Sequence, residues 1–274
     1  MVRSVYAYIA TVALLLGLTP PASADADADR ARRLPTSALS LILAGYEAYR
    51  AGDLDGAAKS WVPAALVAPH RLQYLLAELL LNGSLGPPRT DDAIAFLREP
   101  AAQGHPEGQF WLGRAFDLAG SRAEAVRWYT AAAAQRSIEA AAALGALQEK
   151  AGDYPSAQRA YQQAAAAGHA RAQNNLGVLY ADGRIPMING GEAQRWLGEA
   201  ARQGLADAQF NLGSLFERGG NGVPQDDVEA FVWLTRAAAQ GHADARKILP
   251  LVSARLTQQQ RAVAEQRLTG GGER

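Results

Sequence analysis

The 274-residue chain is 49% hydrophobic and 20% charged, a composition typical of a packed globular protein rather than a disordered one. Its 27 basic and 27 acidic residues balance, so the charge gives no electrostatic basis for binding nucleic acid. The cysteine count is 0, which excludes a disulfide framework and leaves packing alone to stabilise the fold.

Residues 1–24 are predicted to be a signal peptide that is cleaved near Ala24. Arg3 gives a positive start, residues 9–18 form a short apolar core, and residues 22–24 (Ala-Ser-Ala) form a small-residue cleavage site. The alternative is a membrane anchor, but this apolar core is shorter than the ~20 residues that a bilayer requires. We therefore expect a periplasmic or secreted protein whose mature chain opens with a disordered lead-in over residues 25–38.

The rest of the chain shows helical spacing of apolar residues and an internal repeat. A Leu-Gly pair recurs at residues 112–113, 144–145, 176–177 and 212–213, in steps of 32, 32 and 36 residues. Self-similarity of this length is the signature of a helical solenoid, and the insertions at 183–191 and 219–224 fall in turns, where solenoids accept them. One position in the second helix of the repeats is mostly aromatic, and the tryptophans there are predicted to be core residues: Trp61, Trp128, Trp196 and Trp233.

Residues 206–242 carry the clearest copy of the repeat. Their pattern A-Q-x-x-L-G-x-x-[FY], then G-V-x-x-D, then A-x-x-W-x-x-x-A-A-x-x-G, resembles the Sel1-like repeat, a relative of the tetratricopeptide repeat. The resemblance implies an all-α fold, a right-handed α-solenoid of about six helix-turn-helix repeats over residues 39–248. A C-terminal capping helix and tail are expected over residues 249–274.

Several helix ends can be predicted from local chemistry. Asp226 with Glu229, and Ser121 with Glu124, have the spacing of capping boxes. Thr257 is a further plausible helix start, for the C-terminal cap.

Two prolines are predicted to interrupt helices. Pro100 should kink or stop the helix over residues 91–103, and Pro250 should end the helix that begins at Ala243. The physical reason is that proline lacks a backbone donor and its ring clashes with the preceding turn.

The sequence contains no metalloprotease, serine hydrolase or phosphate-loop motif and no cysteine that could act as a nucleophile. Four histidines share one repeat position, directly after the turn that closes the second helix: His70, His105, His169 and His242. Because a solenoid separates equivalent positions by about 10 Å, we expect these histidines to begin helices rather than to bind a metal. No metal, cofactor or enzymatic activity is therefore expected.

The resemblance implies that the first helices of successive repeats line a concave face that binds a protein. Positions counted from each Leu-Gly pair give the candidate partner-binding residues: Tyr74, Glu78, Phe110, Arg114, Asp117, Asn174, Phe210 and Glu217. Aromatic residues beside charged ones suit the binding of a peptide or of a partner's helix. The alternative is that Phe110 and Phe210 only pack sideways against neighbouring helices, and the inserted turns remain a second possible contact surface.

These observations predict a non-catalytic periplasmic scaffold that binds a protein partner, with no nucleic acid and no stable membrane insertion after cleavage. Relatives that it resembles regulate a membrane sensor kinase or serve in polysaccharide secretion and envelope complexes, which suggests two kinds of partner. The alternative from another class is a hydrolase acting on cell-wall fragments. That reaction needs paired acid and base groups, whereas Glu78, Asp117 and Glu217 belong to separate repeats.

Overall fold

The computed structural model describes residues 36–67, 70–185 and 189–269. The predicted signal peptide and residues 25–35 of the predicted lead-in lie outside the described residues. Within the described ranges every regular element is an α-helix, apart from one isolated β-bridge between Gly220 and Val223. None of these helices combines the length and the hydrophobicity needed to cross a membrane.

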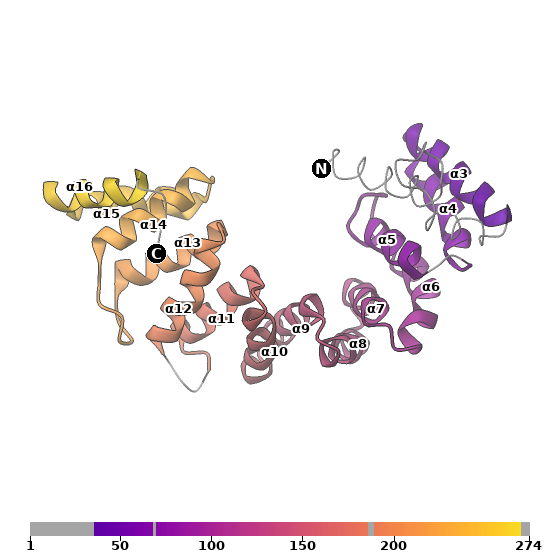
Figure 1. Cartoon of the computed structure of the whole chain (residues 1–274), viewed down its shortest axis with the longest axis horizontal. Coiled ribbons are helices and arrows are strands. Elements are labelled where there is room, and N and C mark those ends of the chain that lie inside the picture. The colour runs from indigo at the N-terminus through magenta and orange to yellow at the C-terminus, as the bar shows by residue number, and fades with distance from the viewer. Residues whose placement is uncertain (1–35, 68–69, 186–188, 270–274) are drawn as a thin grey trace, which may run out of the picture. The chain divides into compact units, whose positions relative to one another are not determined.

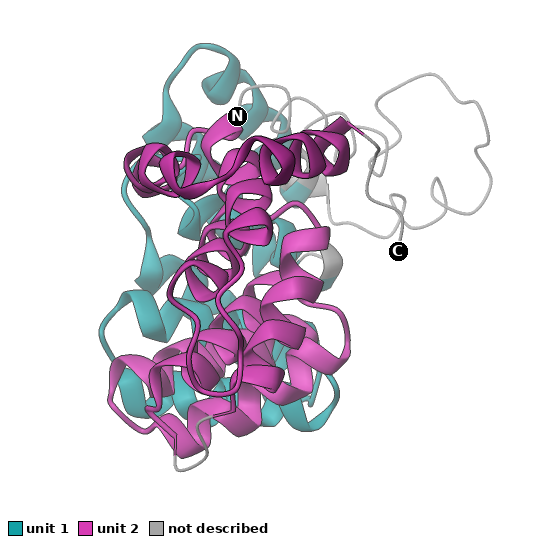
Figure 2. Ribbon diagram, turned by 90° about the vertical axis from the view of Figure 1, so that its left-hand side faces the viewer, with its two compact units in different colours: residues 1–137 teal, residues 138–274 magenta. Residues whose placement is uncertain are grey.

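The chain forms two compact units, residues 1–137 and 138–274, each built from helix pairs (Figures 1 and 2). The first unit contains α3 (Thr36–Arg50), α4 (Leu54–Ala65), α5 (His70–Leu81), α6 (Thr90–Ala102), α7 (Pro106–Leu118) and α8 (Arg122–Ala134). The second contains α9 (Ile138–Lys150), α10 (Tyr154–Ala166), α11 (Ala170–Asp182), α12 (Gly190–Arg202), α13 (Ala206–Arg218), α14 (Asp227–Ala239), α15 (Ala243–Arg255) and α16 (Gln258–Thr269).

Each odd-numbered helix from α3 to α13 packs against the even-numbered helix that follows it, and we call these the first and second helices of a repeat. First helices also contact first helices of the next repeat: α5 with α7 in one unit, and α9 with α11, α11 with α13 and α13 with α15 in the other. This arrangement confirms the predicted all-α repeat solenoid.

Close packing inside each repeat explains the Leu-Gly pair. A Cβ added at Gly113 would lie 2.7 Å from the ring of Tyr129, and one added at Gly145 would lie 2.5 Å from the ring of Tyr161. The glycine thus leaves the room that a large buried side chain of the second helix fills. The equivalent pairs in the next two repeats are Gly177 with Leu197 and Gly213 with Leu234.

The prediction that the recurring tryptophans are core residues is wrong for Trp128 and Trp233, because the residue after each of these two is the fully buried one, Tyr129 and Leu234 respectively. Tyr129 is fully buried, whereas Trp128 is partly exposed and donates its indole N–H to Glu124 at 3.1 Å. Trp233 is also partly exposed and donates to Glu229 at 3.0 Å. Of the other two, Trp61 is partly exposed and Trp196 is buried.

The predicted interruptions at Pro100 and Pro250 do not occur, since α6 and α15 both continue past their prolines. Pro100 costs α6 one backbone hydrogen bond, but its side chain is fully buried. It lies against α7, where a Cβ added at Gly108 would be 3.2 Å from the Cβ of Pro100. In α15, Val252 lies two residues beyond Pro250 and is fully buried. Packing therefore outweighs the local cost of each proline.

The capping predictions have mixed outcomes. Asp226 accepts hydrogen bonds from the backbone N–H groups of Val228 and Glu229, at 2.9 and 3.0 Å, which confirms its predicted N-cap role. The Glu229 carboxylate binds the Trp233 indole and Arg267, and the Asp226 N–H donates to the carbonyl of Phe216, so the second half of the predicted capping box is wrong.

Ser121 occupies the N-cap position of α8, but its side chain makes no capping bond to the residues that the structure describes. The Glu124 carboxylate binds a tryptophan indole instead, so the predicted capping box is wrong there.

The C-terminal helix α16 begins with a complete capping box. Thr257 Oγ1 accepts from the backbone N–H of Gln260 at 3.2 Å, and Gln260 Oε1 accepts from the backbone N–H of Thr257 at 2.9 Å. This reciprocal pair satisfies two backbone donors at the start of the helix, which confirms the predicted helix start at Thr257.

Pairs of glutamines link successive repeats. The buried Gln173 donates through Nε2 to the carbonyl of Ala165 at 3.1 Å and accepts from Gln203 Nε2 at 2.7 Å. The same arrangement recurs for Gln109 with Gln135 and for Gln209 with Gln240. In the α9–α10 repeat both equivalent positions are alanine, Ala141 and Ala167. The two members of a pair are thus present together or absent together.

Candidate partner-binding face

The first helices of the first unit carry five of the predicted partner-binding residues. Arg114 and Asp117 form an ion pair at 3.5 Å in which both side chains are partly exposed. The partly buried ring of Phe110 lies 5.0 Å from Trp111, centroid to centroid. The remaining two are Tyr74, which is buried, and Glu78, which is partly exposed. The structure therefore brings Arg114 and Asp117 together.

In the second unit, two of the three predicted residues are held by neighbours on adjacent helices. Phe210 of α13 stacks on His242, with ring centroids 4.3 Å apart and an interplanar angle of 17°. Glu217 accepts from Arg255 at 3.0 Å, and the same guanidinium binds Asp227 at 2.8 Å. Phe210 and Glu217 thus fix α13 against the helices that follow it.

The third predicted residue, Asn174, belongs to a chain of hydrogen bonds across α9, α10, α11 and α13. Asn211 donates to Asn174 Oδ1 at 2.9 Å, and Asn174 donates to Asn175 Oδ1 at 3.0 Å. Asn175 donates to the Tyr161 hydroxyl at 3.0 Å, which donates to Glu149 at 2.8 Å. We call these five residues the amide chain.

The electrostatics of the amide chain favour a neutral Tyr161. Burial of its ring, together with the Glu149 carboxylate that accepts from its hydroxyl, raises the pKa of Tyr161 well above the usual range. The hydroxyl therefore keeps its proton near neutral pH and remains a donor to Glu149. A chain with one carboxylate at its end and amides along it can both donate to and accept from a bound molecule.

One further polar group lies on the same side of α13. Ser214 is three residues after Asn211, a spacing that places two residues on one helix face. Its side chain is 8% exposed, and its hydroxyl has no hydrogen-bond partner among the described residues. A buried hydroxyl without a partner normally costs free energy, and this oxygen atom is itself buried, so it lies beneath the surface that a ligand could contact.

Sequence reasoning identified Asn174 but missed the other members of the amide chain. The signal was present, because Asn175 and Asn211 each directly precede the leucine of a Leu-Gly pair, at Leu176 and Leu212. Glu149 lies five residues after Leu144, the same offset from a Leu-Gly pair as Asp117 and Glu217. The approach of Tyr161 to Glu149 could not be found in this way, since it depends on how α9 packs on α10.

The inserted turns of the second unit contact each other. The backbone N–H of Gly190 donates to the carbonyl of Asn221 at 3.0 Å, and Asn221 Nδ2 donates to the carbonyl of Ala181 at 3.2 Å. Residues 186–188 lie outside the described residues. The described parts of both turns therefore join the two repeats to each other.

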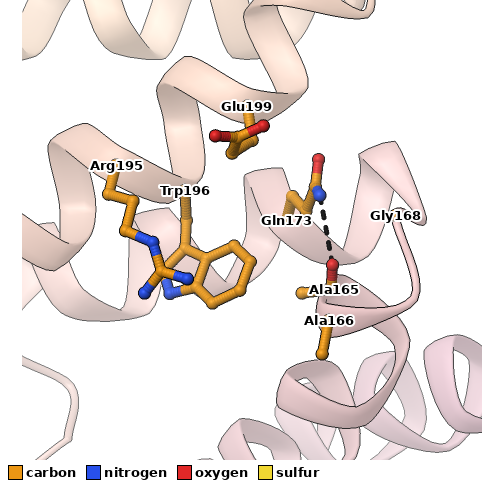
Figure 3. Close-up of a pocket in the computed structure, with 7 residues that line it drawn as sticks. All are labelled: Ala165, Ala166, Gly168, Gln173, Arg195, Trp196 and Glu199. Atoms are coloured by element: carbon orange, nitrogen blue, oxygen red, sulfur yellow. Dashed lines mark hydrogen bonds between the residues drawn. The ribbon is translucent and has the colours of Figure 1, made fainter.

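A pocket of about 310 Å³ lies where the end of α10 meets α11 and α12 (Figure 3). Its lining consists of three small residues, one buried amide and three larger side chains of α12: Ala165, Ala166, Gly168, Gln173, Arg195, Trp196 and Glu199. Figure 3 shows the Arg195 guanidinium beside the indole of Trp196, where its carbon lies 4.3 Å from the ring centroid. Nothing in the sequence signalled this pocket.

The histidines are closer together than predicted in the first unit. The rings of His70 and His105 lie 4.4 Å apart, edge to face, so the expected separation of about 10 Å is wrong for this pair. The reason is that α5 and α7 are adjacent and each histidine lies at a helix start, where side chains can converge. Within the described residues, no three or more His, Asp or Glu side chains form a group that could hold a metal.

Comparison with known proteins identifies the repeats. The Sel1 repeat family model matches residues 70–105, 106–137, 170–205 and 206–242, together just over half of the chain. These segments correspond to the pairs α5–α6, α7–α8, α11–α12 and α13–α14. Among the helix pairs outside these matches, α9–α10 has alanines at the positions of the paired glutamines.

Solved structures with the same fold include two Sel1-type proteins, whereas no curated protein matches the chain. One is c5321, a protective antigen of uropathogenic Escherichia coli with an SLR fold, 26% identical with a TM-score of 0.66. That match covers 85% of this chain and 56% of c5321, so the chain spans little more than half of c5321. The other is a Sel1 repeat protein from Oxalobacter formigenes, 23% identical with a TM-score of 0.57, covering 85% of this chain and 99% of that one.

Proposed function

Because the chain belongs to the Sel1 repeat family, we propose that it is a non-catalytic scaffold that binds a protein partner on the face formed by its first helices. Repeats of this family typically mediate protein–protein interaction, and the family is generally non-catalytic. The carboxylates Asp117 and Glu217 are engaged by Arg114 and Arg255, which supports a structural rather than an acid–base role for them.

The amide chain is the observation that carries this proposal. It joins two adjacent first helices through the bond from Asn211 to Asn174, and each side-chain amide has more donors and acceptors than that chain uses. Amide groups that the chain leaves unused can hydrogen bond a peptide backbone, while an apolar side chain packs on the ring of Phe210, the residue before Asn211.

The proposed location is the periplasm, and the proposed partner is a membrane sensor kinase or a component of an envelope or polysaccharide secretion complex. The support is the signal-like pattern in residues 1–24 and a chain without cysteine, which an oxidising compartment leaves chemically unchanged.

The test is affinity capture from envelope extract, using the protein purified from the periplasm of the bacterium that expresses it and identifying captured proteins by mass spectrometry. Specific recovery of a kinase or secretion component supports the scaffold proposal. If the folded protein captures no specific partner, the scaffold proposal is contradicted. If the protein releases fragments from purified cell wall, the hydrolase alternative is favoured. Recovery in the cytoplasmic fraction with an uncleaved N-terminus would contradict the proposed location.

A further inference from the structure

We propose that Asn82, in the turn between α5 and α6, is a site of spontaneous deamidation that converts its side-chain amide into a carboxylate. An asparagine followed by glycine is the usual substrate of this reaction, because a glycine without a Cβ leaves its backbone nitrogen open to approach. Three such pairs occur in the chain: Asn82–Gly83, Asn189–Gly190 and Asn221–Gly222. The sequence does not distinguish among them, whereas their hydrogen bonds do. This modification does not depend on the proposed partner binding.

The reaction needs only water and the chain itself. The backbone nitrogen of Gly83 loses its proton to the solvent and attacks Cγ of Asn82, so that a new C–N bond closes a succinimide ring. The C–N bond of the side-chain amide breaks, and its nitrogen takes up a proton and leaves as ammonia. Water then opens the ring at one of its two carbonyls, which gives aspartate or isoaspartate at residue 82.

Asn82 has both features that favour ring closure. The residue is exposed, and the N–H of Gly83 donates no hydrogen bond within the part of the chain that the structure describes. The nitrogen that must attack is therefore free. The amide oxygen of Asn82, Oδ1, accepts from the backbone N–H of Ser84 at 2.8 Å. That donor polarises the amide carbonyl and stabilises the negative charge that its oxygen gains when the nitrogen attacks.

Asn189 has the polarised carbonyl but not the free nitrogen. Its Oδ1 accepts from the backbone N–H of Glu192 at 3.1 Å, as the N-cap of α12. The N–H of Gly190, however, donates to the carbonyl of Asn221 at 3.0 Å, and Gly190 is the first residue of that helix. Ring closure would have to break this bond and unwind the start of α12, so the folded structure protects Asn189.

Asn221 has the free nitrogen but not the polarised carbonyl. Among the described residues, the N–H of Gly222 has no acceptor and Oδ1 of Asn221 has no donor. The Nδ2 of Asn221 instead donates to the carbonyl of Ala181 at 3.2 Å, which holds the side chain on α11. The backbone is held as well, because Gly220 and Val223 exchange two hydrogen bonds, at 2.8 and 2.9 Å, across the turn. Both restraints oppose the rotation that ring closure requires.

The product changes the charge at the end of α5. A carboxylate at residue 82 directly follows this helix, and the partial negative charge of a helix C-terminus disfavours an anion. Glu78 lies four residues earlier, a spacing at which like charges repel. Isoaspartate also lengthens the backbone of a turn that is closed by the bond from the Arg89 N–H to the Leu80 carbonyl, at 3.0 Å. The reacted chain should therefore be less stable in its first unit.

The experiment follows the reaction at all three pairs in the full chain, aged at neutral pH with and without urea. Trypsin places the three asparagines in separate peptides, residues 72–89, 185–195 and 219–236, so mass spectrometry can measure each rate. In the folded chain Asn82 should react at least about tenfold faster than Asn189 or Asn221, since each of those must first break a hydrogen bond. In urea the three rates should agree within about threefold.

The control variant is Asn82→Gln, whose longer side chain closes a ring far more slowly. Ageing should lower the urea concentration at the unfolding midpoint of the unaltered protein but not that of this variant. Three equal rates in the folded chain, or a reaction at Asn82 that urea accelerates as much as the other two, would overturn the proposal. Aspartate without isoaspartate would also overturn it, because direct hydrolysis of the amide gives aspartate alone.

Discussion

Tyr161 packs directly on Gly145, so closely that a Cβ added to the glycine would lie 2.5 Å from the ring. The same tyrosine donates its hydroxyl hydrogen to Glu149 and accepts from Asn175. One contact between the two helices of a repeat therefore also positions the polar face that we assign to partner binding.

Gly145→Ala is expected to destabilise the protein by about 1–3 kcal/mol, because the added methyl group overpacks the contact with Tyr161. The matched control is Gly198→Ala, in the middle of α12, where the nearest atom is 3.5 Å away at the flexible end of Arg202. That change should stabilise by about 0.5–1 kcal/mol through helix propensity. Urea unfolding measures both, and equal effects of the two substitutions would contradict the packing explanation.

Arg136→Gly is expected to stabilise the first unit. Arg136 has a positive φ of 67°, at the position where four other repeats close their second helix with glycine: Gly104, Gly168, Gly204 and Gly241. A left-handed backbone costs an ordinary residue about 1 kcal/mol that glycine does not incur. The measurement is the thermal unfolding midpoint, and a lower midpoint in the variant would show that the arginine side chain contributes more than its backbone costs.

The glutamine pair predicts a non-additive result. Gln173→Ala and Gln203→Ala should each be destabilising, because each leaves a buried polar group without its partner. The double variant should lose less than the sum, with a coupling of about 0.5–1.5 kcal/mol, since it reproduces the alanine pair Ala141 and Ala167. A double-mutant cycle in urea tests this, and simple additivity would contradict the link.

Much of the fold could be predicted from the sequence because the repeat signals report local backbone geometry. Gly104 and Gly168 both have a positive φ at the end of a second helix, and such positions recur with the repeat wherever glycine is required. Which residues of a helix face the core is harder to predict than where the helix begins and ends. Trp128 is partly exposed and Tyr129 is buried, and a shift of one residue along the helix decides between them.

The candidate site could be predicted only in part. Asn174 was found because its position relative to the Leu-Gly pair is fixed within one repeat. Its bond to Asn211 depends on how two first helices pack, and the contact of His70 with His105 depends on the same relationship in the other unit. Contacts between repeats are tertiary, so a pattern read within one repeat does not contain them.

Stability should fall at high pH. Burial, with Glu107 nearby, raises the pKa of Tyr74 from 10.0 to about 12, and burial raises that of Tyr161 as well. Because the folded protein binds these protons more tightly than the unfolded chain, their stabilisation is present below pH 10 and is lost progressively above it. The measurement is the urea concentration at the unfolding midpoint, followed from about pH 8 to about pH 12. A flat profile, or the same slope in Tyr161→Phe, would contradict it.

The most direct test of partner binding by the first-helix face uses the double variant Phe210→Ala, Asn211→Ala. The measurement is the affinity of this variant for the partner that the unaltered protein captures. The matched control is Arg159→Ala, Gln194→Ala, which changes two exposed residues on second helices of the same unit. With folding checked by circular dichroism, the first-helix variant should bind at least about tenfold more weakly, while the control binds as the unaltered protein does. Unchanged affinity in the first-helix variant, or equal losses in both, would contradict the assignment of this face.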